Sequence, residues 1–316
     1  MKPSSNLPAA YGGSGWSPRP TSLRQEIGSI WGPGGLDSEW APLEAVLLHP
    51  PGPEVEALVD TDAALMLEPL TPARLRAEHG ALAEAYRRSG VEVVLLDPPG
   101  PVPPNTMFCR DLFFMTPEGA ILARPASSTR AGEERLVARR LSALGVPILM
   151  SVRGEGTFEG ADALWIDPGA VLLATGLRTN EAGAAQVDWL LQEMGVEVVR
   201  VDLPYGTMHL LGTVNLAGPD LAVAWPGRVP HRAVEALRAR GCRVLFLPDE
   251  QEARAGMALN FVALAPYRVL MPAGCPRTRA FYEAHGVACL EVEIGELRRA
   301  AGGMGCLSGI LRRAIP

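Results

Sequence analysis

The chain has 316 residues, of which 47% are hydrophobic and 20% charged, and its formal net charge at pH 7 is -6. This length allows one large domain or two. An acidic balance without a run of basic residues argues against nucleic acid as a partner. No segment approaches the roughly 18 apolar residues of a membrane helix, and residues 1–16 lack the apolar stretch of a secretory signal. We therefore expect no membrane association and a cytosolic location.

The five cysteines are an odd number and show no CxxC spacing. Neither a disulfide framework nor a zinc site is indicated, so we expect free thiols, no metal and no cofactor. Glycine and proline are frequent, at 34 and 29 residues, which favours short strands and tight turns over a helical bundle. The sequence leaves the oligomeric state open, a homo-oligomer included.

Residues 1–40 are rich in proline, glycine and serine and show no sustained hydrophobic period, so we interpret them as an N-terminal extension. We expect a single catalytic domain over residues 41–316. It opens with a buried strand at 43–49, an amphipathic helix at 71–90 and a second strand at 91–97.

This theme recurs four times, with a hairpin in front of each helix. The second unit has a hairpin over 107–125, a helix at 131–144 and a strand at 146–152. Later units follow at residues 161–204, 213–248 and 257–294. A recurrence of roughly 50–60 residues predicts a closed, pseudosymmetric α/β array, because one such unit cannot bury its own apolar face. The alternative is an open doubly wound sheet, but no GxGxxG follows the first strand.

Four short segments place reactive or charged side chains in loops or at strand ends. In chain order they are PNTMFCRD (104–111), TFEGAD (157–162), MHLLG (208–212) and GGMGC (302–306). This set resembles the guanidino-modifying enzyme superfamily, which includes arginine deiminases, dimethylarginine dimethylaminohydrolases and amidinotransferases. The resemblance covers residues 40–316 and implies the pentein fold, a five-bladed pseudosymmetric α/β propeller of repeated ββαβ units.

Cys306 is the candidate nucleophile. A guanidinium carbon is a poor electrophile until its charge is fixed and a leaving nitrogen is protonated, and a thiolate attacks such a carbon well. The glycines before Cys306 allow the backbone to approach a substrate closely. If residues 307–313 begin a helical turn, the partial charge at its N-terminus would also lower the pKa of the thiol. The alternative is a buried, inert cysteine.

The resemblance assigns further groups around the reacting carbon. It implies that His209 acts as general acid and base, that Glu159 orients and polarises it, and that Asp111 pairs with the guanidinium. Asp162 matches a second acid that supports the substrate or the local structure. The alternatives are a core histidine, a solvated loop carboxylate at Glu159 and an ion pair between Asp111 and the neighbouring Arg110.

Three positions bear on the rest of the substrate. Asn105, Arg130 and Arg178 match positions that hold the α-carboxylate and nearby groups in arginine deiminases and, in part, in dimethylarginine hydrolases. Two arginines in one pocket favour an anionic ligand, so the resemblance implies a small-molecule guanidino amino acid as partner rather than agmatine. Solvated surface arginines are the alternative.

Leu211 is where the sequence departs from both enzyme types. Arginine deiminases carry an aspartate here that binds the terminal guanidinium nitrogens, and dimethylarginine hydrolases usually carry a lysine. Leucine cannot hydrogen-bond an unsubstituted NH2, and a buried unpaired donor costs about 1–3 kcal/mol, so an apolar wall suits an alkylated nitrogen better. Leu211 as a simple core residue is the alternative.

The function that we expect is hydrolysis of arginine or an Nω-substituted arginine to citrulline and an amine, through a covalent thiouronium intermediate on Cys306. Amidino transfer from arginine to an amine acceptor is the first alternative, because the segment SEWAPLEAVLLH (38–49) also resembles amidinotransferases. Arginine deimination is the second alternative. A pentein-like binding protein without activity is the non-enzyme alternative.

Overall fold

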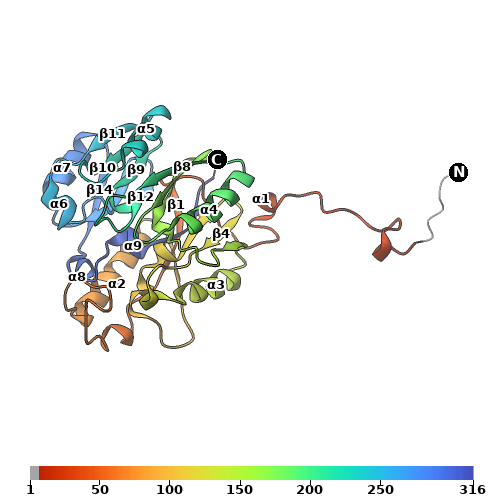
Figure 1. Ribbon diagram of the computed structural model, residues 1–316, viewed down its shortest axis with the longest axis horizontal. Coiled ribbons are helices and arrows are strands. Elements are labelled where there is room, and N and C mark those ends of the chain that lie inside the picture. Colours follow the sequence, from red (N-terminus) through yellow and green to blue (C-terminus); the bar gives the residue numbers. More distant parts are fainter. Residues whose placement is uncertain (1–6, 316) are drawn as a thin grey trace.

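The chain forms a ring of five three-stranded sheets in the computed structural model, which describes residues 7–315. Each sheet is one blade, and the blades follow one another around a common centre (Figure 1). The predicted five-bladed α/β propeller is therefore confirmed. The blades are β15 (Gly309–Arg313), β1 (Leu43–Leu48) and β2 (Glu92–Leu95); β3 (Phe113–Thr116), β4 (Gly119–Leu122) and β5 (Ile148–Ser151); β6 (Ala163–Asp167), β7 (Ala170–Thr175) and β8 (Glu197–Asp202); β9 (Val214–Gly218), β10 (Leu221–Ala224) and β11 (Arg243–Phe246); β12 (Val262–Ala265), β13 (Arg268–Pro272) and β14 (Ala288–Val292).

Every blade has the same topology. The first two strands in each set pair antiparallel, and a helix then leads to a third strand that pairs parallel with the second. The crossing helices are α2 (Pro72–Arg88), α3 (Glu133–Ala143), α4 (Glu181–Glu193), α5 (His231–Ala239) and α7 (Pro276–Ala284). The other short helices are α1 (Leu23–Glu26), α6 (Glu250–Arg254), α8 (Gly295–Arg299) and α9 (Met304–Leu307).

The ring closes through the C-terminal strand, which is where one sequence expectation is wrong. Residues 307–313 do not continue as a helical turn after Cys306. The short helix α9 ends at Leu307, and β15 then pairs antiparallel with β1, with Ile310 opposite Val46. The cause is tertiary, because β1 would otherwise present an unpaired edge to the ring.

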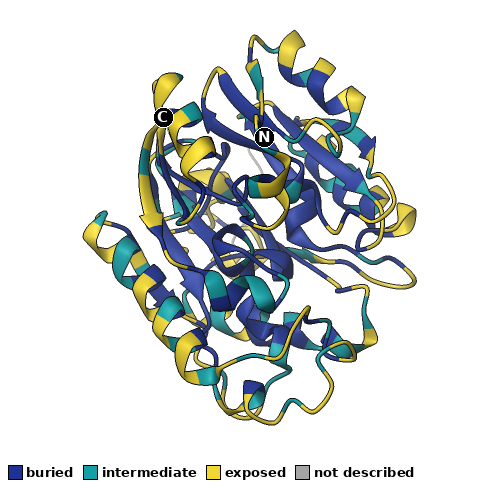
Figure 2. Ribbon diagram, turned by 90° about the vertical axis from the view of Figure 1, so that its left-hand side faces the viewer, coloured by how far each residue is buried: buried dark blue, intermediate teal, exposed yellow. Residues whose placement is uncertain are grey.

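The strands form the interior and the helices form the outer layer. Figure 2 shows strands that are buried along most of their length and helices that are exposed on their outer faces. Strand β7 reads AVLLAT and is buried at five of its six residues, as expected for a strand covered on both faces. Helix α4 begins directly after Asn180, whose side chain caps it by accepting a hydrogen bond from Gly183 N at 2.8 Å.

The N-terminal segment has two parts. Its outer part, including α1, runs away from the ring (Figure 1), whereas residues 32–40 pack against it. Gly35 N donates to Leu311 O at 2.9 Å, and buried Glu39 accepts from Arg110 at 2.8 Å. The division at residue 40 stays a prediction, and residues 1–6 lie outside the described residues. No helix among residues 7–315 is long and apolar enough to cross a membrane.

Candidate active site

The loops that lead into the first strand of each blade converge at the centre of the ring. Asp111 lies in a 3-10 turn (Cys109–Leu112) before β3, and Glu159 lies at the start of a 3-10 turn (Gly160–Asp162) before β6. His209 precedes the 3-10 turn (Leu210–Gly212) that leads into β9, and Cys306 lies in α9 before β15. Pseudosymmetry therefore brings together four side chains that are far apart in sequence.

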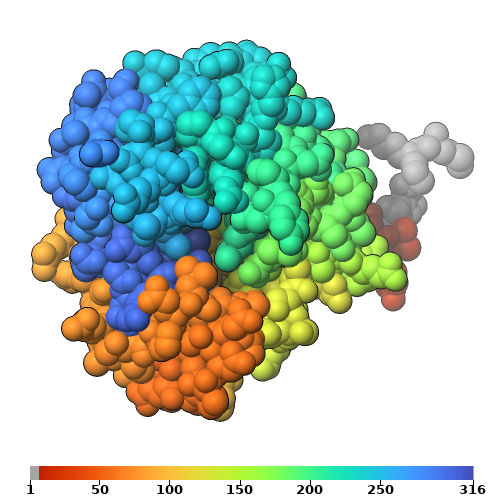
Figure 3. Space-filling model, turned by 60° about the vertical axis from the view of Figure 1, so that its left-hand side comes forward, coloured from red at the N-terminus to blue at the C-terminus, as the bar shows by residue number. Residues whose placement is uncertain are grey.

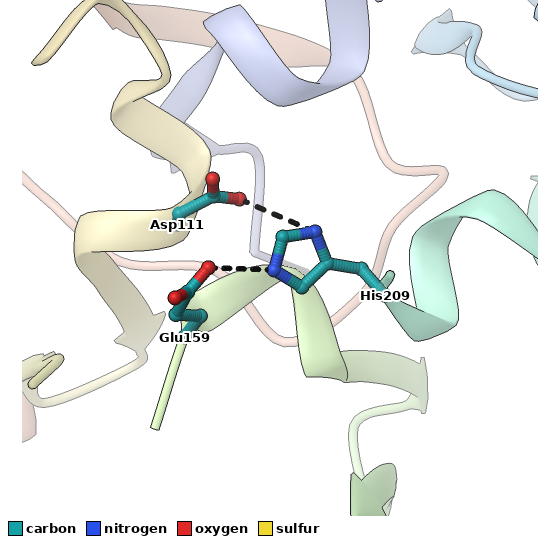
Figure 4. Close-up of side chains that lie close together, drawn as sticks. All are labelled: Asp111, Glu159 and His209. Atoms are coloured by element: carbon teal, nitrogen blue, oxygen red, sulfur yellow. Dashed lines mark hydrogen bonds and ion pairs between the residues drawn. The ribbon is translucent and has the colours of Figure 1, made fainter. Parts of the chain in front are cut away.

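Glu159 and His209 form the closest pair of this group. His209 Nε2 lies 2.7 Å from Glu159 Oε2, and Figure 4 shows the imidazole between this carboxylate and Asp111. Burial would lower the pKa of His209, but the charges of Asp111, Glu159 and Asp162 and the hydrogen bond to Glu159 outweigh it and raise that pKa well above its usual value. Burial acts against ionisation of Glu159, yet His209, Arg130 and Arg178 hold its pKa low. Both shifts favour an imidazolium beside a carboxylate.

Two arginines complete the charge balance around Glu159. Arg130 Nη1 lies 2.7 Å from Asp111 Oδ2 and 3.3 Å from Glu159 Oε2, and the same guanidinium contacts Glu133 at 2.9 Å. Arg178 Nη1 lies 3.3 Å from Glu159 Oε1. Arg130 is thus engaged by three carboxylates, whereas Arg178 has one.

Asp111 keeps one oxygen without a partner. Its Oδ2 binds Arg130, while Oδ1 is buried and accepts no hydrogen bond from the described residues. His209 Nδ1 lies 3.9 Å from Oδ1, beyond hydrogen-bond distance. The ion pair between Asp111 and Arg110 that we considered does not form, because Arg110 pairs with Glu39. A buried carboxylate oxygen with no donor is a site for a cationic N–H group.

Asp111, Glu159 and His209 also have the ligand types that divalent metals use, with one ligand atom from each within 4.8 Å of the others. Arg130 already places a guanidinium between the two carboxylates, and His209 is held protonated. Two positive groups inside the cluster oppose a divalent cation. The geometry fits a planar organic cation better.

Cys306 is the third residue of the four-residue helix α9 and is only half-buried. Burial and the charge of Asp111 raise the pKa of its thiol to about 11, and a hydrogen bond from Asn260 acts in the opposite direction. The expected lowering of this pKa by a helix N-terminus is therefore wrong, because the following residues form β15 and a carboxylate faces the thiol. The free site holds a neutral thiol.

The glycines before Cys306 are each explained by a close neighbour. A Cβ atom at Gly302 would overlap the ring of Phe108. A Cβ atom at Gly303 would lie 2.6 Å from Asn260 Oδ1, and one at Gly305 would lie 2.9 Å from the same oxygen. The run GGMG thus lets the loop close onto these two side chains.

Asn260 is a site residue that the sequence reasoning missed. Its Nδ2 donates to Cys306 Sγ at 3.2 Å, and its Oδ1 accepts from Gly305 N at 2.6 Å. Asn260 lies two residues before β12, at the place in the fifth blade that Asp111 takes before β3. The signal was a polar residue in the apolar run MALNFVALA, at the same point of the repeat as the other four groups.

We expect Asn260→Ala to raise the pKa of the Cys306 thiol and to lower kcat/KM about 10- to 100-fold, since a hydrogen bond to a charged group contributes about 1.5–3 kcal/mol. The pH dependence of thiol alkylation measures the first effect. The matched control is Asn215→Ala, because Asn215 Nδ2 binds the carbonyls of Leu259 and Phe261 on either side of Asn260. If both variants shift the thiol pKa equally, Asn260 acts only by holding the backbone.

Two connected compartments open around Cys306 and His209, which line both. The inner compartment has a volume of about 20 Å³, and its wall combines polar and charged side chains with the apolar residues Leu65, Phe108 and Met208. The outer compartment has a volume of about 300 Å³ and is mainly apolar. Figure 3 shows the face of the molecule on which early, middle and C-terminal segments of the chain meet around this recess.

Most of the predicted substrate-binding residues line the inner compartment. Asn105, Arg130 and Arg178 line the inner compartment and Leu211 lines the outer one. Asn105 Nδ2 also donates to Ala64 O at 2.7 Å, so it holds the segment that carries Leu65.

Asp162 lines neither compartment. Its Oδ1 accepts from Leu210 N at 3.0 Å and its Oδ2 from Thr179 at 2.7 Å. It therefore positions the turn after His209, in line with the structural half of its expected role.

A five-bladed ring with a cysteine, a histidine and two carboxylates at its centre defines a protein of the pentein class. Solved structures that share this fold include a dimethylarginine hydrolase and an amidinotransferase. A variant of dimethylarginine dimethylaminohydrolase from Pseudomonas aeruginosa, complexed with citrulline, superposes with a TM-score of 0.72 at 23% identity, covering 85% of this chain and 99% of that one. SxtG, an amidinotransferase from Microseira wollei, gives a TM-score of 0.70 at 17% identity, covering 90% and 98%.

Sequence comparison identifies the family within this class of fold. Residues 68–307 match the family described as N,N dimethylarginine dimethylhydrolase, eukaryotic. The chain is 30% identical over 269 residues to N(G),N(G)-dimethylarginine dimethylaminohydrolase of Streptomyces coelicolor, which covers 82% of this chain and 98% of that relative. The chain belongs to the N,N-dimethylarginine dimethylhydrolase family.

Proposed function

We propose that this protein hydrolyses an Nω-methylated arginine to citrulline and a methylated amine, with Cys306 as the nucleophile. The observation that carries the proposal is the unpaired Asp111 Oδ1, which lies with Cys306 and His209 on the wall of one compartment. A guanidinium donates planar N–H groups, and a carboxylate accepts them at fixed geometry.

The bound guanidinium also changes the state of the thiol. In the free site the negative charge of Asp111 opposes ionisation of Cys306. A substrate cation neutralises this charge, so the pKa of the thiol falls and its proton passes to solvent. The thiolate therefore forms when the electrophile is already in place.

The reaction then takes two steps. Cys306 Sγ forms a bond to the guanidino carbon, His209 gives a proton to the substituted nitrogen, and the bond between carbon and that nitrogen breaks. Neutral His209 next takes a proton from water as its oxygen bonds to the same carbon, and the carbon–sulfur bond breaks. One water is consumed, and the products are citrulline and a protonated amine. Glu159 holds the imidazole in position through both steps.

We propose that the amino-acid end lies in the inner compartment beside Arg178 and Asn105. Leu65 is part of the wall of this compartment, whose volume of about 20 Å³ holds at most about one water molecule, so the wall has to move for substrate to bind. Leu65 has a φ of 61°, a left-handed conformation that is unfavourable for leucine. The backbone of Leu65 is therefore strained in this conformation of the wall.

Arg178→Leu is expected to raise KM for dimethylarginine about 10- to 100-fold, because a hydrogen bond to a carboxylate contributes about 1.5–3 kcal/mol. Dimethylated agmatine, which lacks that carboxylate, serves as the matched substrate and should be turned over equally by both proteins. Steady-state kinetics on the two substrates measure this. An equal loss on both would mean that Arg178 acts only through Glu159.

The raised pKa of Cys306 predicts a pH profile. Alkylation of the free enzyme by neutral iodoacetamide should accelerate up to about pH 11, because the thiol ionises only there. The cationic reagent 2-chloroacetamidine can pair with Asp111 and should react readily near neutral pH. A plateau of the iodoacetamide rate near neutral pH would contradict the raised pKa.

The direct test of the function is product analysis with dimethylarginine, plain arginine, and arginine plus glycine or lysine as acceptors. We expect citrulline and dimethylamine from the first substrate and a slower reaction with arginine, because Leu211 offers no acceptor to an unsubstituted nitrogen. Ornithine formed only with an acceptor would indicate amidino transfer instead. No product from any guanidine would favour a binding protein.

The cytosolic location and the oligomeric state of the protein stay predictions. All five cysteines are free thiols in the structure, which supports a reducing compartment such as the cytosol. The molar mass of the protein in solution tests whether it forms a homo-oligomer.

A further inference from the structure

The outer compartment is large for the leaving group of the proposed reaction. Its volume is about 300 Å³, which corresponds to about ten water molecules at about 30 Å³ each. Dimethylamine has three non-hydrogen atoms and would occupy about a third of it. The remaining space therefore has room for a longer substituent.

With the amino-acid end in the inner compartment, as proposed above, the outer compartment lies on the side of the substituted nitrogen. The inner compartment holds Asp111, Arg130, Arg178 and Asn105, which suit the guanidinium and the amino-acid end. The outer one meets it only at shared wall residues that include Cys306 and His209, and His209 is the proton donor to the departing nitrogen. A substituent on that nitrogen would extend outward.

The walls of the outer compartment are apolar, and its charged groups are positive. Leu211, Leu259, Met257 and Trp225 supply apolar surface. Besides His209, which it shares with the inner compartment, its charged side chains are Arg228 and Arg254, and no aspartate or glutamate among the described residues lines the space.

The side chains of these two arginines differ in how firmly they are held. Arg228 is fixed by Gly206 O at 2.7 Å and lies over the ring of Trp225, whereas Arg254 is exposed at the end of α6. A positively charged substituent would be repelled here, and a carboxylate would be attracted.

We infer that the substrate class extends to arginines whose ω-nitrogen carries an apolar substituent larger than methyl, either uncharged or ending in a carboxylate. This inference rests on the proposed function. The reaction is unchanged: the carbon–nitrogen bond to the substituted nitrogen breaks, that nitrogen leaves as the longer amine after protonation by His209, and water supplies the oxygen of citrulline.

A substrate series on the unmodified protein tests the inference. We expect kcat/KM for Nω-butylarginine to equal or exceed that for dimethylarginine. Nω-(3-carboxypropyl)arginine should perform at least as well as the butyl compound, and Nω-(4-aminobutyl)arginine at least tenfold worse. A butyl compound more than tenfold slower than dimethylarginine would overturn the inference, while turnover of dimethylarginine would leave the proposed function intact.

Gly212 offers a way to fill the compartment. It lines the space, its φ lies outside the left-handed region, and a Cβ atom there meets no heavy atom within 4 Å. Gly212→Leu should lower the ratio of kcat/KM for the butyl compound to that for dimethylarginine at least tenfold. Gly100→Leu is the matched control, because Gly100 also has open space around its Cβ position and lines neither compartment. This control should leave the ratio unchanged.

The reverse orientation of substrate gives a different result. If the amino-acid end occupied the outer compartment, Gly212→Leu would impair dimethylarginine as strongly as the butyl compound, and the ratio would not change. That outcome would overturn the inference. A protein that releases no citrulline from any member of the series would instead contradict the proposed function itself.

Discussion

Cys306→Ser is expected to lower kcat for dimethylarginine by about 10⁴-fold or more, because removal of a nucleophile that acts together with its general acid costs effects of this order or larger. A hydroxyl has a much higher pKa than a thiol, so a bound guanidinium cannot ionise it at neutral pH. The release of citrulline over time measures the loss. Mass spectrometry of the unmodified protein, quenched during turnover, should show an adduct that the variant lacks.

The matched control for this prediction is Cys289→Ser. Cys289 is also half-buried and its thiol pKa is also raised to about 11, but it lies in β14 and lines neither compartment. Its replacement should leave kcat unchanged. If Cys306→Ser retained activity comparable to that of the Cys289 variant, covalent catalysis by Cys306 would be wrong.

Asp111→Asn should act in opposite directions on turnover and on thiol reactivity. Loss of one partner of a buried charge pair costs about 2–5 kcal/mol, so kcat/KM should fall at least about 30-fold. The pKa of the Cys306 thiol should fall as well, because the carboxylate that opposes its ionisation is gone. Iodoacetamide should therefore alkylate the variant faster at neutral pH. A merely destabilised protein would not gain thiol reactivity while its fold is intact.

Glu133→Gln is the control for the loss of an ion pair to Arg130. Glu133 contacts the same guanidinium at 2.9 Å but lines neither compartment. Burial raises the pKa of Glu133 to about 7 against the opposing effect of Arg130, so glutamine resembles its protonated form. The control should keep most of the activity and the original pH profile of alkylation. Equal losses in both variants would mean that Asp111 only supports Arg130.

The pseudosymmetry of the ring explains how such a site arises. In each blade the chain reaches the centre just before the first strand, so one short turn per repeat presents a side chain there. Four of these turns carry Asp111, Glu159, His209 and Cys306, and the fifth carries Asn260. Asn260, which contacts Cys306, thus occupies the same structural position as the groups to which the proposed chemistry is assigned.

The sequence by itself determined the repeat and the reaction class. Hairpin, helix and strand follow from local hydrophobic periods and turn residues, which are short-range properties of the chain. The strand expected over 43–49 and the helix expected over 131–144 are examples, since β1 spans Leu43–Leu48 and α3 spans Glu133–Ala143. The four motifs pointed to Cys306 and His209 through their resemblance to the guanidino-modifying enzymes, which depends on residue types and their order and needs no coordinates.

Only the tertiary structure decided how the site is charged and shaped. The strand after Cys306 depends on pairing with β1 across the whole chain, and the raised pKa of its thiol depends on Asp111 and on burial. Asn260 became visible because the ring places its turn beside the thiol. The outer compartment is formed by segments remote in sequence, so its volume and positive rim could not be read from any local pattern. Contacts between remote segments set these properties, and a local sequence pattern does not show which remote segments come into contact.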